Sequence, residues 1–453
     1  MPADRQPIDL SSPAAAMAPP AASAASRPWS DARVRAILLL LMLLYALNYL
    51  DRQVINILAQ SIKAQLHLSD LQLGLLTGTA FGIFYSLLGL PIARLADRFS
   101  RVRIIGASLT LWSLMTIACG FAQSYVQLFA IRLGVGVGEA GGTPPAQSLI
   151  SDFFPNARRG TAMAVFNLGV PLGSFMGFLM GGLLNDALGW RKALMVAGIP
   201  GLILVPIILR FIPEPPRGLA DGVVLQESAS RQSFRAAVIS LLQRPSFLRL
   251  ILGGTFGIFV IYITGAWFPP LFIRLHHLTA GQMGAWMALS TGIGGTLGAL
   301  GGGALADRLK RRHPRAEIWV LMIATALTAP AMYIAAAAHD TPLALAAVFV
   351  LFTLGFVWMG PTSAMVQRVA PVQTRALATG IQLFVGNIIA LAFGPPLIGL
   401  ASDLLVPVAG GQSLRWAMMG ASVIGLFGTL CYGLAGRHLL RDVTRNEAAG
   451  SGA

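Results

Sequence analysis

Charged residues are scarce in this sequence, and their scarcity indicates the class of protein. Of the 453 residues only 11% are charged and 55% are hydrophobic, and the mean hydropathy is +0.69. Soluble domains carry about 25% charged residues. The composition therefore argues against a soluble globular protein and predicts an integral membrane protein whose spans are helices.

Cysteines and catalytic groupings are also scarce. The two cysteines, Cys119 and Cys431, both lie in apolar runs, so we expect no disulfide framework. The six histidines lie at the ends of apolar segments or between them, and no Ser/His/Asp grouping, metal-ligand cluster or phosphate-binding loop stands out in the sequence. We therefore expect that the protein is not an enzyme and has no cofactor or metal.

The net charge of +15 is spread over short loops between apolar segments rather than gathered in one basic patch. This distribution argues against nucleic-acid binding and is typical of a membrane topology signal. If the chain crosses twelve times, 26 of the 33 Lys and Arg residues lie on the side of the termini and five lie on the opposite side. The positive-inside rule then predicts that both termini are cytoplasmic.

Twelve apolar segments are predicted, six on each side of a polar linker that contains Pro213, Pro215 and Pro216. They span residues 34–61, 70–93, 103–122, 124–150, 160–186, 191–211, 246–272, 279–305, 316–337, 342–367, 375–402 and 413–436. The predicted fold is all-α, with twelve transmembrane helices in two six-helix bundles. The predicted divisions are a disordered cytoplasmic tail at 1–33, a bundle at 34–211, a cytoplasmic linker at 212–245, a bundle at 246–436 and a cytoplasmic tail at 437–453.

An internal repeat supports this division. The run Leu95–Arg98 recurs as Leu305–Arg308, 210 residues later, and Pro155 and Arg159 recur as Pro371 and Arg375, 216 residues later. The two halves are therefore expected to be parallel copies related by an axis along the membrane normal.

The first apolar segment carries charge deep inside it. Asp51 and Arg52 lie about 22 Å along a helix that starts near Ala36, so both are expected within the hydrocarbon layer. Ionisable residues at this depth are candidate functional residues, since each is unfavourable unless it is paired or faces a polar cavity. A polar stripe on the same helix face must point toward something other than lipid, and it consists of Tyr45, Asn48, Tyr49, Arg52 and Asn56. Of these, Tyr45, Asn48, Tyr49 and Arg52 are expected to bind substrate.

The fourth segment carries a second charged cluster. Arg132 and Glu139 lie seven residues apart and therefore on one helix face. Depth counting allows Asp51 to pair with Arg132, which would leave Arg52 and Glu139 exposed to a cavity. Without a substrate, Arg52 can then pair with Glu139 if the two helix faces meet across that cavity. On this interpretation Asp51 and Glu139 couple transport to protons, and Arg52 and Arg132 contact the substrate. The alternative is a purely structural network of four charges.

The second half of the chain lacks ionisable residues in the middle of its apolar segments. We expect its neutral and aromatic side chains to form the other wall of a cavity, with substrate contacts from Tyr262, Trp267, Gln382 and Asn387. A cavity that is charged on one wall and apolar on the other suits an amphipathic substrate.

Two loop motifs resemble the signature of the major facilitator superfamily of transporters. Gly303–Arg308 matches that signature, and Ala93–Arg98 matches it apart from Ala93 and Ser100 in place of glycines. The resemblance implies that Asp97 meets the positive end of the helix dipole near Arg375 when the cytoplasmic side is closed. The implied gating residues are Asp97, Arg98, Arg101, Asp307, Arg308 and Arg375.

Three further runs resemble the spinster-like branch of that superfamily: Asn48–Arg52, Gly136–Ala140 and Phe393–Gly399. Members of the branch export lysophospholipids or sphingosine-1-phosphate. Short outside loops without Asn-x-Ser/Thr sequons favour a bacterial member, located in the inner membrane.

The leading functional prediction is a proton-coupled secondary active transporter that works by alternating access and exports or flips an anionic amphipathic lipid. A proton symporter of small organic anions such as carboxylates or sugar acids, or a multidrug exporter, is the alternative. The symporter would need a second cationic anchor in the second half, and the sequence offers none in mid-membrane. A transceptor or a non-transporting structural membrane protein is a third class, which the loop motifs disfavour. Expected partners are the substrate, protons and membrane lipids; the protein is expected to be a monomer.

Overall fold

The computed structural model describes residues 29–221, 234–313, 315–371, 374–439 and 441–444, and every regular element in these ranges is a helix. The first helices are α1 (Asp31–Leu66), α2 (Asp70–Gly74), η1 (Leu75–Thr79), α3 (Ala80–Arg98), α4 (Arg101–Cys119), α5 (Tyr125–Glu139), α6 (Thr143–Phe153), α7 (Asn156–Asn167) and α8 (Gly169–Phe211). The segment between the halves contains η2 (Leu219–Asp221) and α9 (Phe234–Leu242).

The remaining described helices follow residue 244. They are α10 (Pro245–Leu275), α11 (Ala280–Leu289), η3 (Ser290–Gly294), α12 (Gly295–Lys310), α13 (Ala316–Ala337), α14 (Thr341–Phe356), α15 (Met359–Val369), α16 (Arg375–Gly386), η5 (Asn387–Ala392), α17 (Gly394–Ala409), η6 (Gly410–Gln412), α18 (Ser413–Ala421) and α19 (Ile424–Gly436).

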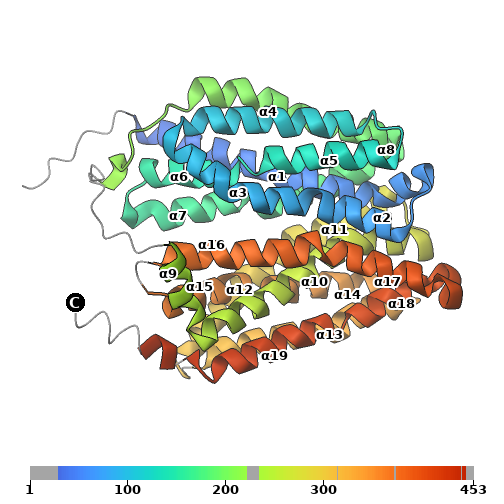
Figure 1. The fold of residues 1–453 in the computed structure, drawn as a ribbon. Coiled ribbons are helices and arrows are strands. Elements are labelled where there is room, and N and C mark those ends of the chain that lie inside the picture. Colours follow the sequence, from blue (N-terminus) through green and yellow to red (C-terminus); the bar gives the residue numbers. More distant parts are fainter. Residues whose placement is uncertain (1–28, 222–233, 314, 372–373, 440, 445–453) are drawn as a thin grey trace, which may run out of the picture.

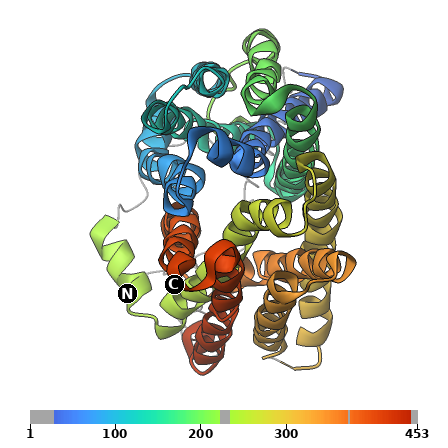
Figure 2. The same ribbon diagram turned by 90° about the vertical axis from the view of Figure 1, so that its right-hand side faces the viewer.

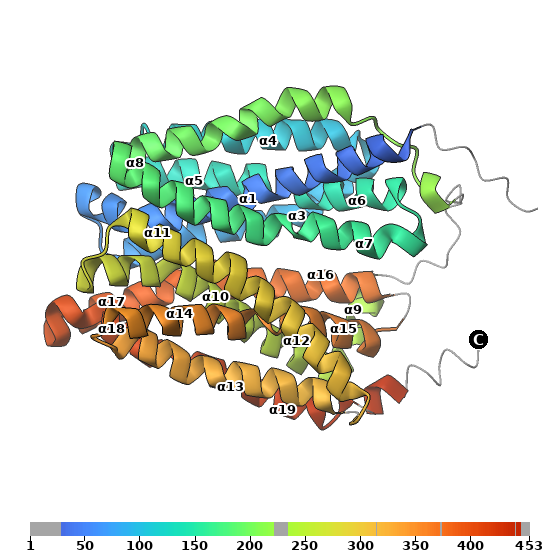
Figure 3. The same cartoon turned by 180° about the vertical axis from the view of Figure 1, so that it is seen from behind.

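The helices form two bundles that lie side by side. We call α1–α8 the N half and α10–α19 the C half; Figures 1 and 3 show them as two layers with their long axes roughly parallel. Helix α1 begins and α19 ends at the same end of the molecule, which we call the termini end. The opposite, far end faces the viewer in Figure 2.

In the part of the chain that the structure describes, eight helical stretches are long and apolar enough to cross a membrane. Two of them, residues 156–211 and 377–436, contain 56 and 60 residues, although one crossing needs only about 20. Each contains a glycine with positive φ where the chain changes direction, Gly189 at 79° and Gly410 at 52°. Glycine has no Cβ and adopts this backbone conformation at little cost.

Several predicted segments are interrupted in the structure, among them 124–150, 342–367 and 413–436. The sequence suggested a continuous span at 124–150, but the helix ends at Glu139 and restarts at Thr143. Gly141 and Gly142 lie in the turn between them, and Pro144 follows at the start of α6. The missing N–H of this proline is tolerated in the first turn of a new helix.

The internal repeat is visible at the far end of both halves. α1 and α10 are followed by His67 and His277, both left-handed, with φ of 51° and 54°. The next helices each begin with a capping box, Ser69 with Gln72 before α2 and Thr279 with Gln282 before α11. All three pairs are 210 residues apart, so the register of the repeat is fixed here.

Polar contacts join the halves at the far end. Asp70 of α2 accepts two hydrogen bonds from the guanidinium of Arg274, at 3.0 and 2.8 Å, and is also paired with Lys63. The carboxylate of Asp403 in α17 accepts from the backbone N–H groups of Asp70 and Leu71, at 2.9 and 2.8 Å. Both interactions cross between the halves at the start of α2.

A matching contact runs in the other direction. Asp186 of α8 accepts from the backbone N–H of Gly281 in α11, at 2.8 Å. Each half therefore places an aspartate at the N-terminus of a helix in the other half, where the helix dipole favours negative charge. We call these contacts, made by Asp70, Arg274, Asp403, Asp186 and Gly281, the far-end seal.

Glycines allow the two backbones to approach at this seal. A Cβ on Gly399 of α17 would lie 2.3 Å from the carbonyl oxygen of Asp70, and a Cβ on Gly182 of α8 would lie 2.3 Å from that of Ala280. Neither separation is compatible with a side chain. The halves are therefore packed backbone to backbone at the far end of the cavity described next.

Candidate functional site

Arg52 is the centre of the site. It lies midway along α1, and its guanidinium donates to Glu139 Oε2 through Nε and to Asn48 Oδ1 through Nη2, both at 2.9 Å. The side chain of Arg52 is 6% exposed and that of Glu139 is 0% exposed. Breaking a pair this deeply buried would leave an uncompensated charge, which is strongly unfavourable.

Aromatic rings surround the same guanidinium. Its carbon lies 4.9 Å from the ring centroid of Tyr49, 4.5 Å from that of Phe81 and 4.3 Å from that of Tyr85. All three distances are within the range of cation–π attraction. The charge of Arg52 is thus held in place by one carboxylate, one amide and three rings from α1, α3 and α5.

The expected ion pair between Asp51 and Arg132 is not formed in the part of the chain that the structure describes. Asp51 instead accepts a hydrogen bond from Thr116 of α4, at 3.1 Å. Arg132 is 1% exposed, its Nε has no hydrogen-bond partner among the described residues, and its guanidinium carbon lies 5.7 Å from the Phe81 ring centroid. Depth along a helix does not determine in which direction a side chain leaves it, so the predicted ion pair was wrong.

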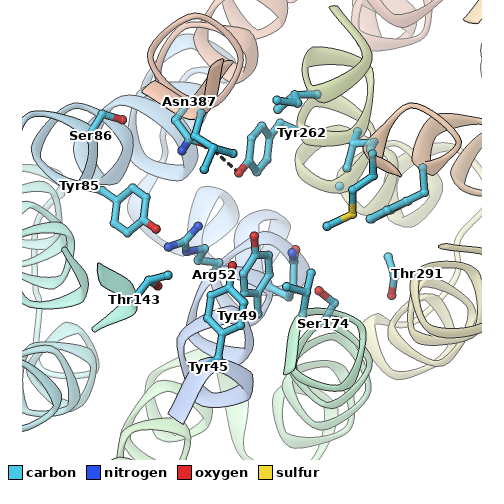
Figure 4. A pocket seen from close by; sticks show the side chains of 18 of the residues that line it. Tyr45, Tyr49, Arg52, Tyr85, Ser86, Thr143, Ser174, Tyr262, Thr291 and Asn387 are labelled. Atoms are coloured by element: carbon cyan, nitrogen blue, oxygen red, sulfur yellow. Dashed lines mark hydrogen bonds between the residues drawn. The ribbon is translucent and has the colours of Figure 1, made fainter. Parts of the chain in front are cut away.

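A cavity of about 420 Å³ lies between the two halves and includes Arg52 in its wall. In Figure 4 Arg52 occupies the middle of the site, with Tyr85 on one side and the hydrogen-bonded pair Tyr262 and Asn387 across from it. The N half contributes mainly polar and tyrosine side chains: Tyr45, Tyr49, Arg52, Gln53, Asn56, Tyr85, Ser86, Thr143, Gln147 and Ser174.

The C half contributes a mainly apolar wall. Besides Tyr262, Thr291 and Asn387 it presents Ile258, Ile261, Phe352, Phe356, Trp358, Met359, Leu383 and Phe384. Among the described residues that line the cavity, Arg52 is the only charged side chain. The cavity can therefore hold a molecule with one anionic group and a large apolar part.

The predicted substrate contacts fall into two groups. Arg52, Tyr45, Tyr49, Tyr262 and Asn387 line the cavity. The other four do not line it: Asn48, Arg132, Trp267 and Gln382.

These four side chains are buried in the helix packing. Asn48 lies behind Arg52 as its hydrogen-bond partner. Trp267 donates through Nε1 to the carbonyl of Pro395, at 2.9 Å, and Gln382 is 2% exposed. A side chain on the correct helix can still point away from the cavity.

The carboxylates predicted to carry protons also lie outside the cavity wall. Asp51 is 3% exposed and Glu139 is 0% exposed. Glu139 reaches the cavity only through Arg52, to which it is bound. A molecule that bound the guanidinium of Arg52 would therefore directly change the hydrogen bonding of Glu139.

The predicted gating residues lie at the termini end. Arg98, Asp307, Arg308 and Arg375 are exposed, and the side chain of Asp97 lies outside the described part of the chain. Arg101 differs, because it is 1% exposed and forms ion pairs with Asp152 of α6 and, at 2.7 Å, with Glu214. Arg101 is therefore an internal bridge in this structure.

Sequence reasoning overlooked several residues of the site. Tyr85 and Ser86 line the cavity from α3, and Gln53, Thr143 and Ser174 line it from α1, α6 and α8. The signal that could have found Tyr85 and Ser86 is the rarity of polar side chains in the second apolar segment. The far-end seal was also missed, since Asp70 and Arg274 lie at segment ends and read as ordinary loop charges.

Comparison with known proteins gives consistent matches along the chain. Residues 41–395 match the Major Facilitator Superfamily. An MFS-type efflux pump of Mycolicibacterium smegmatis is 34% identical over 404 residues, which cover 89% of this chain and 92% of that protein. Protein spinster homolog 1 of Xenopus tropicalis is 28% identical over 415 residues, 86% of this chain and 78% of that protein.

A solved structure matches over nearly its whole length. It is a bacterial homologue of the human lysosomal transporter spinster, in an inward-facing and occupied conformation, with 28% identity and a TM-score of 0.82. The match covers 91% of this chain and 99% of that one. The spinster resemblance noted in the sequence is thus confirmed, together with the all-helical fold.

Proposed function

The chain belongs to the Major Facilitator Superfamily, and we propose that it is a proton-coupled secondary active transporter of an anionic amphipathic lipid, such as a lysophospholipid or a sphingosine-1-phosphate-like molecule. One observation carries this proposal. Among the described residues, the cavity between the halves has a single charged lining residue, Arg52, and an apolar wall opposite to it.

The two walls match the two parts of such a lipid. A guanidinium binds phosphate oxygens in a bidentate manner, and Arg52 is held rigidly for this by its partners and rings. The acyl chain would lie along the C half, against Phe352, Phe356 and Phe384. The tail comes from a bilayer or micelle that is already apolar, so its transfer to this wall changes the free energy little. The contact between the head and Arg52 would therefore set much of the specificity.

Proton coupling would follow from competition for Arg52. An anionic head that binds the guanidinium displaces Glu139, whose only ion-pair partner among the described residues is Arg52. A buried carboxylate without its partner is unfavourable as an anion and can take up a proton instead. Substrate and proton would thereby be linked reciprocally through one guanidinium.

The topology is part of the proposal. The distribution of Lys and Arg supports a cytoplasmic location for both termini and for the linker at 212–245. We count twelve crossings, because Gly189 and Gly410 each divide a stretch of more than 50 residues and because α5–α6 and α11–α12 complete the set. The far-end seal would then close the outer side, the termini end would face inward, and the protein would act as a monomer in the inner membrane.

A second candidate is export of other amphipathic compounds. The M. smegmatis relative is described as an efflux pump, and an apolar wall of aromatic side chains can accept many shapes. Such a pump would depend less on Arg52, because a neutral or cationic compound gains nothing from a guanidinium.

The test uses the purified full-length protein, in detergent for binding and in proteoliposomes for transport. Lysophospholipids should raise the apparent melting temperature by mass action, and Arg52→Lys should weaken this effect because an ammonium cannot reproduce bidentate binding. Glu139→Gln should still bind the lipid but lose the pH dependence of transport. Arg415→Lys, remote from the cavity, is the matched control.

Two results would contradict the proposal. If Arg52→Lys binds lysophospholipid as tightly as the wild type, the headgroup does not use the guanidinium. If Glu139→Gln transports with an unchanged pH profile, the charges around Arg52 are structural. Stabilisation by neutral or cationic amphiphiles in both variants would favour the second candidate.

A further inference from the structure

The cavity continues along α1 beyond Arg52, toward the far end. Gln53 and Asn56 both line it, and Asn56 Nδ2 donates to Gln53 Oε1 at 3.0 Å. Asn56 lies one helical turn from Arg52, a rise of about 6 Å. The proposed anion site and this amide pair are therefore neighbours on a single helix.

The opposite helix leaves room at this point. Gly265 of α10 faces the amides, and a Cβ placed there would lie 3.8 Å from Gln53 Oε1 and 3.9 Å from Asn56 Nδ2. The same Cβ would lie 3.9 Å from the ring of Phe178, which closes the space from α8. Since glycine has no side chain, the space between α1 and α10 is open to a small polar group.

The amides are not fully satisfied by the protein. Asn56 Oδ1 is buried and has no hydrogen-bond partner among the described residues. Buried polar atoms in folded proteins normally have a partner, and exceptions call for an explanation. Ser174, labelled in Figure 4, also lines the cavity and adds a hydroxyl from α8.

We propose that Gln53 and Asn56, with Ser174, form a second binding subsite that receives a hydroxyl-bearing extension of the substrate head. The substrate class is a lysophospholipid whose phosphate is esterified to a small polyol such as glycerol. The inference rests on the proposed function, because it places the phosphate at Arg52.

Charge and hydrogen-bonding capacity select this class. Amide groups donate and accept, as hydroxyls do, so each side satisfies the other. No carboxylate lines the cavity among the described residues, so an ammonium group in the head would have no counter-ion there. A second phosphate would likewise be an unpaired buried charge, which is unfavourable. A bare phosphate monoester would leave the amides without a partner.

The experiment measures binding of three lipids with the same acyl chain to the purified full-length protein. The probes are lysophosphatidylglycerol, lysophosphatidic acid and lysophosphatidylethanolamine. The wild type should bind the glycerol head about tenfold more tightly than the other two, as expected for one or two net hydrogen bonds. Asn56→Leu should remove this advantage and leave the affinity for lysophosphatidic acid unchanged.

A second variant tests the charge argument even if Asn56→Leu folds poorly. Asn56→Asp places a carboxylate in the subsite and should shift the preference toward lysophosphatidylethanolamine, whose ammonium gains a counter-ion. Asn185→Leu alters an amide outside the cavity and serves as the control, with no change expected in either ratio.

The outcomes separate this proposal from the previous one. Equal affinity of the wild type for the three heads, or an equal loss for all three in Asn56→Leu, would overturn the subsite while leaving lipid transport intact. If the folded wild type binds none of the lysophospholipids, the proposed function fails and the subsite with it.

Discussion

The two halves of this protein have the same order of helices but differ in where they carry charged side chains. Features that both halves share belong to the fold, and features that only one half has belong to the site. At the termini end both halves contain an ion pair at equivalent positions, with the acidic and the basic residue exchanged. Arg101 of α4 pairs with Asp152 of α6 in the N half, whereas Glu317 of α13 pairs with Arg368 of α15 in the C half. Glu317 lies 216 positions after Arg101, and Arg368 lies 216 positions after Asp152. The fold therefore requires an ion pair here but not a particular polarity.

Midway along their helices, the two halves differ in whether their side chains are charged. The left-handed histidines and the capping boxes set a register of 210 residues, which places Tyr262 at the position of Arg52 and Ile261 at that of Asp51. The pair Pro155 and Pro371 sets a register of 216, which places Gly355 at the position of Glu139. The C half thus repeats the helices of the N half with every one of these charges replaced. The N half contributes the charged side chain of the cavity wall, Arg52, and the C half contributes a mainly apolar wall.

The largest expected effect is the loss of folding stability when each of these two ion pairs is broken on its own. Arg101 is 1% exposed and also binds Ser148, at 3.0 Å, and Glu214, at 2.7 Å. Arg101→Ala leaves Asp152 and Glu214 without this partner and should lower the free energy of unfolding by about 3–5 kcal/mol. Glu317→Ala should lower it by only about 1 kcal/mol, because Arg368 and Lys310 are 33% and 40% exposed and reach water.

Titration with sodium dodecyl sulfate in mixed micelles measures both losses. Adding Asp152→Arg to Arg101→Glu imposes the polarity of the C half on the N half and should recover part of the stability lost in the single Arg101→Glu variant. Recovery is partial because Glu214 still faces the new carboxylate. Equal losses for Arg101→Ala and Glu317→Ala would contradict the argument from burial.

A smaller effect is expected at the two caps of the far-end seal. Asp403 accepts from two backbone N–H groups of α2, whereas Asp186 accepts from one of α11. Loss of a charged cap is worth about 1 kcal/mol or somewhat more. Asp403→Asn should therefore open the far end more than Asp186→Asn does, shifting the conformational equilibrium several-fold.

Spin labels at Gln123 and Val408, with Cys119 and Cys431 replaced, would report the separation of the halves at the far end. Both label positions are exposed. A Lys192→Gln variant, at an exposed position of α8, controls for general loosening. If both aspartate variants show the wild-type distance distribution, these contacts do not bias the equilibrium.

The smallest effect concerns acid stability and is specific to the N half. Burial alone would raise the pKa of Glu214, but hydrogen bonds from Ser100, Arg101 and the backbone N–H of Val102 outweigh it and hold the pKa below its usual range. A lowered pKa means that the stabilisation is present above the ordinary glutamate value, about 4.3, and is lost as the pH falls through the lower value in the folded protein.

Glu214→Gln should therefore flatten the loss of stability below about pH 4.3. The difference should be under about 1 kcal/mol, since the side chain is 34% exposed and partly screened. Melting temperatures of wild type and variant, followed from pH 6 down to pH 3, measure it. Parallel curves for the two proteins would exclude a contribution from Glu214.

Much of the fold was predictable because its signals are local and strong. Long apolar segments, loop arginines and the repeats Leu95–Arg98 and Leu305–Arg308 are read directly from the chain. Hydrocarbon allows few alternatives to a helix, so the element type follows from composition alone. The break at Gly141 was missed because a short turn inside an apolar segment barely changes its average hydropathy.

The site was predictable only in part. Helical periodicity placed Tyr45, Tyr49 and Arg52 on one face of α1, and all three line the cavity. It allowed Arg52 to pair with Glu139 if the two helix faces meet, and the structure contains this pair. It could not exclude an ion pair between Asp51 and Arg132, because the rotation of one helix relative to another is set by the packing between them.

By itself, then, the sequence determined that the chain is a helical membrane protein with two repeated halves and with its mid-membrane charge on the first half. Each of these follows from apolar length, loop charge and spacing along one chain. Only the tertiary structure decided that Arg52 binds Glu139 within a ring of aromatic side chains, that the amides of Gln53 and Asn56 face Gly265, and that aspartates of each half meet helix ends of the other. These contacts join residues dozens to hundreds of positions apart, and their geometry depends on how the helices pack against one another.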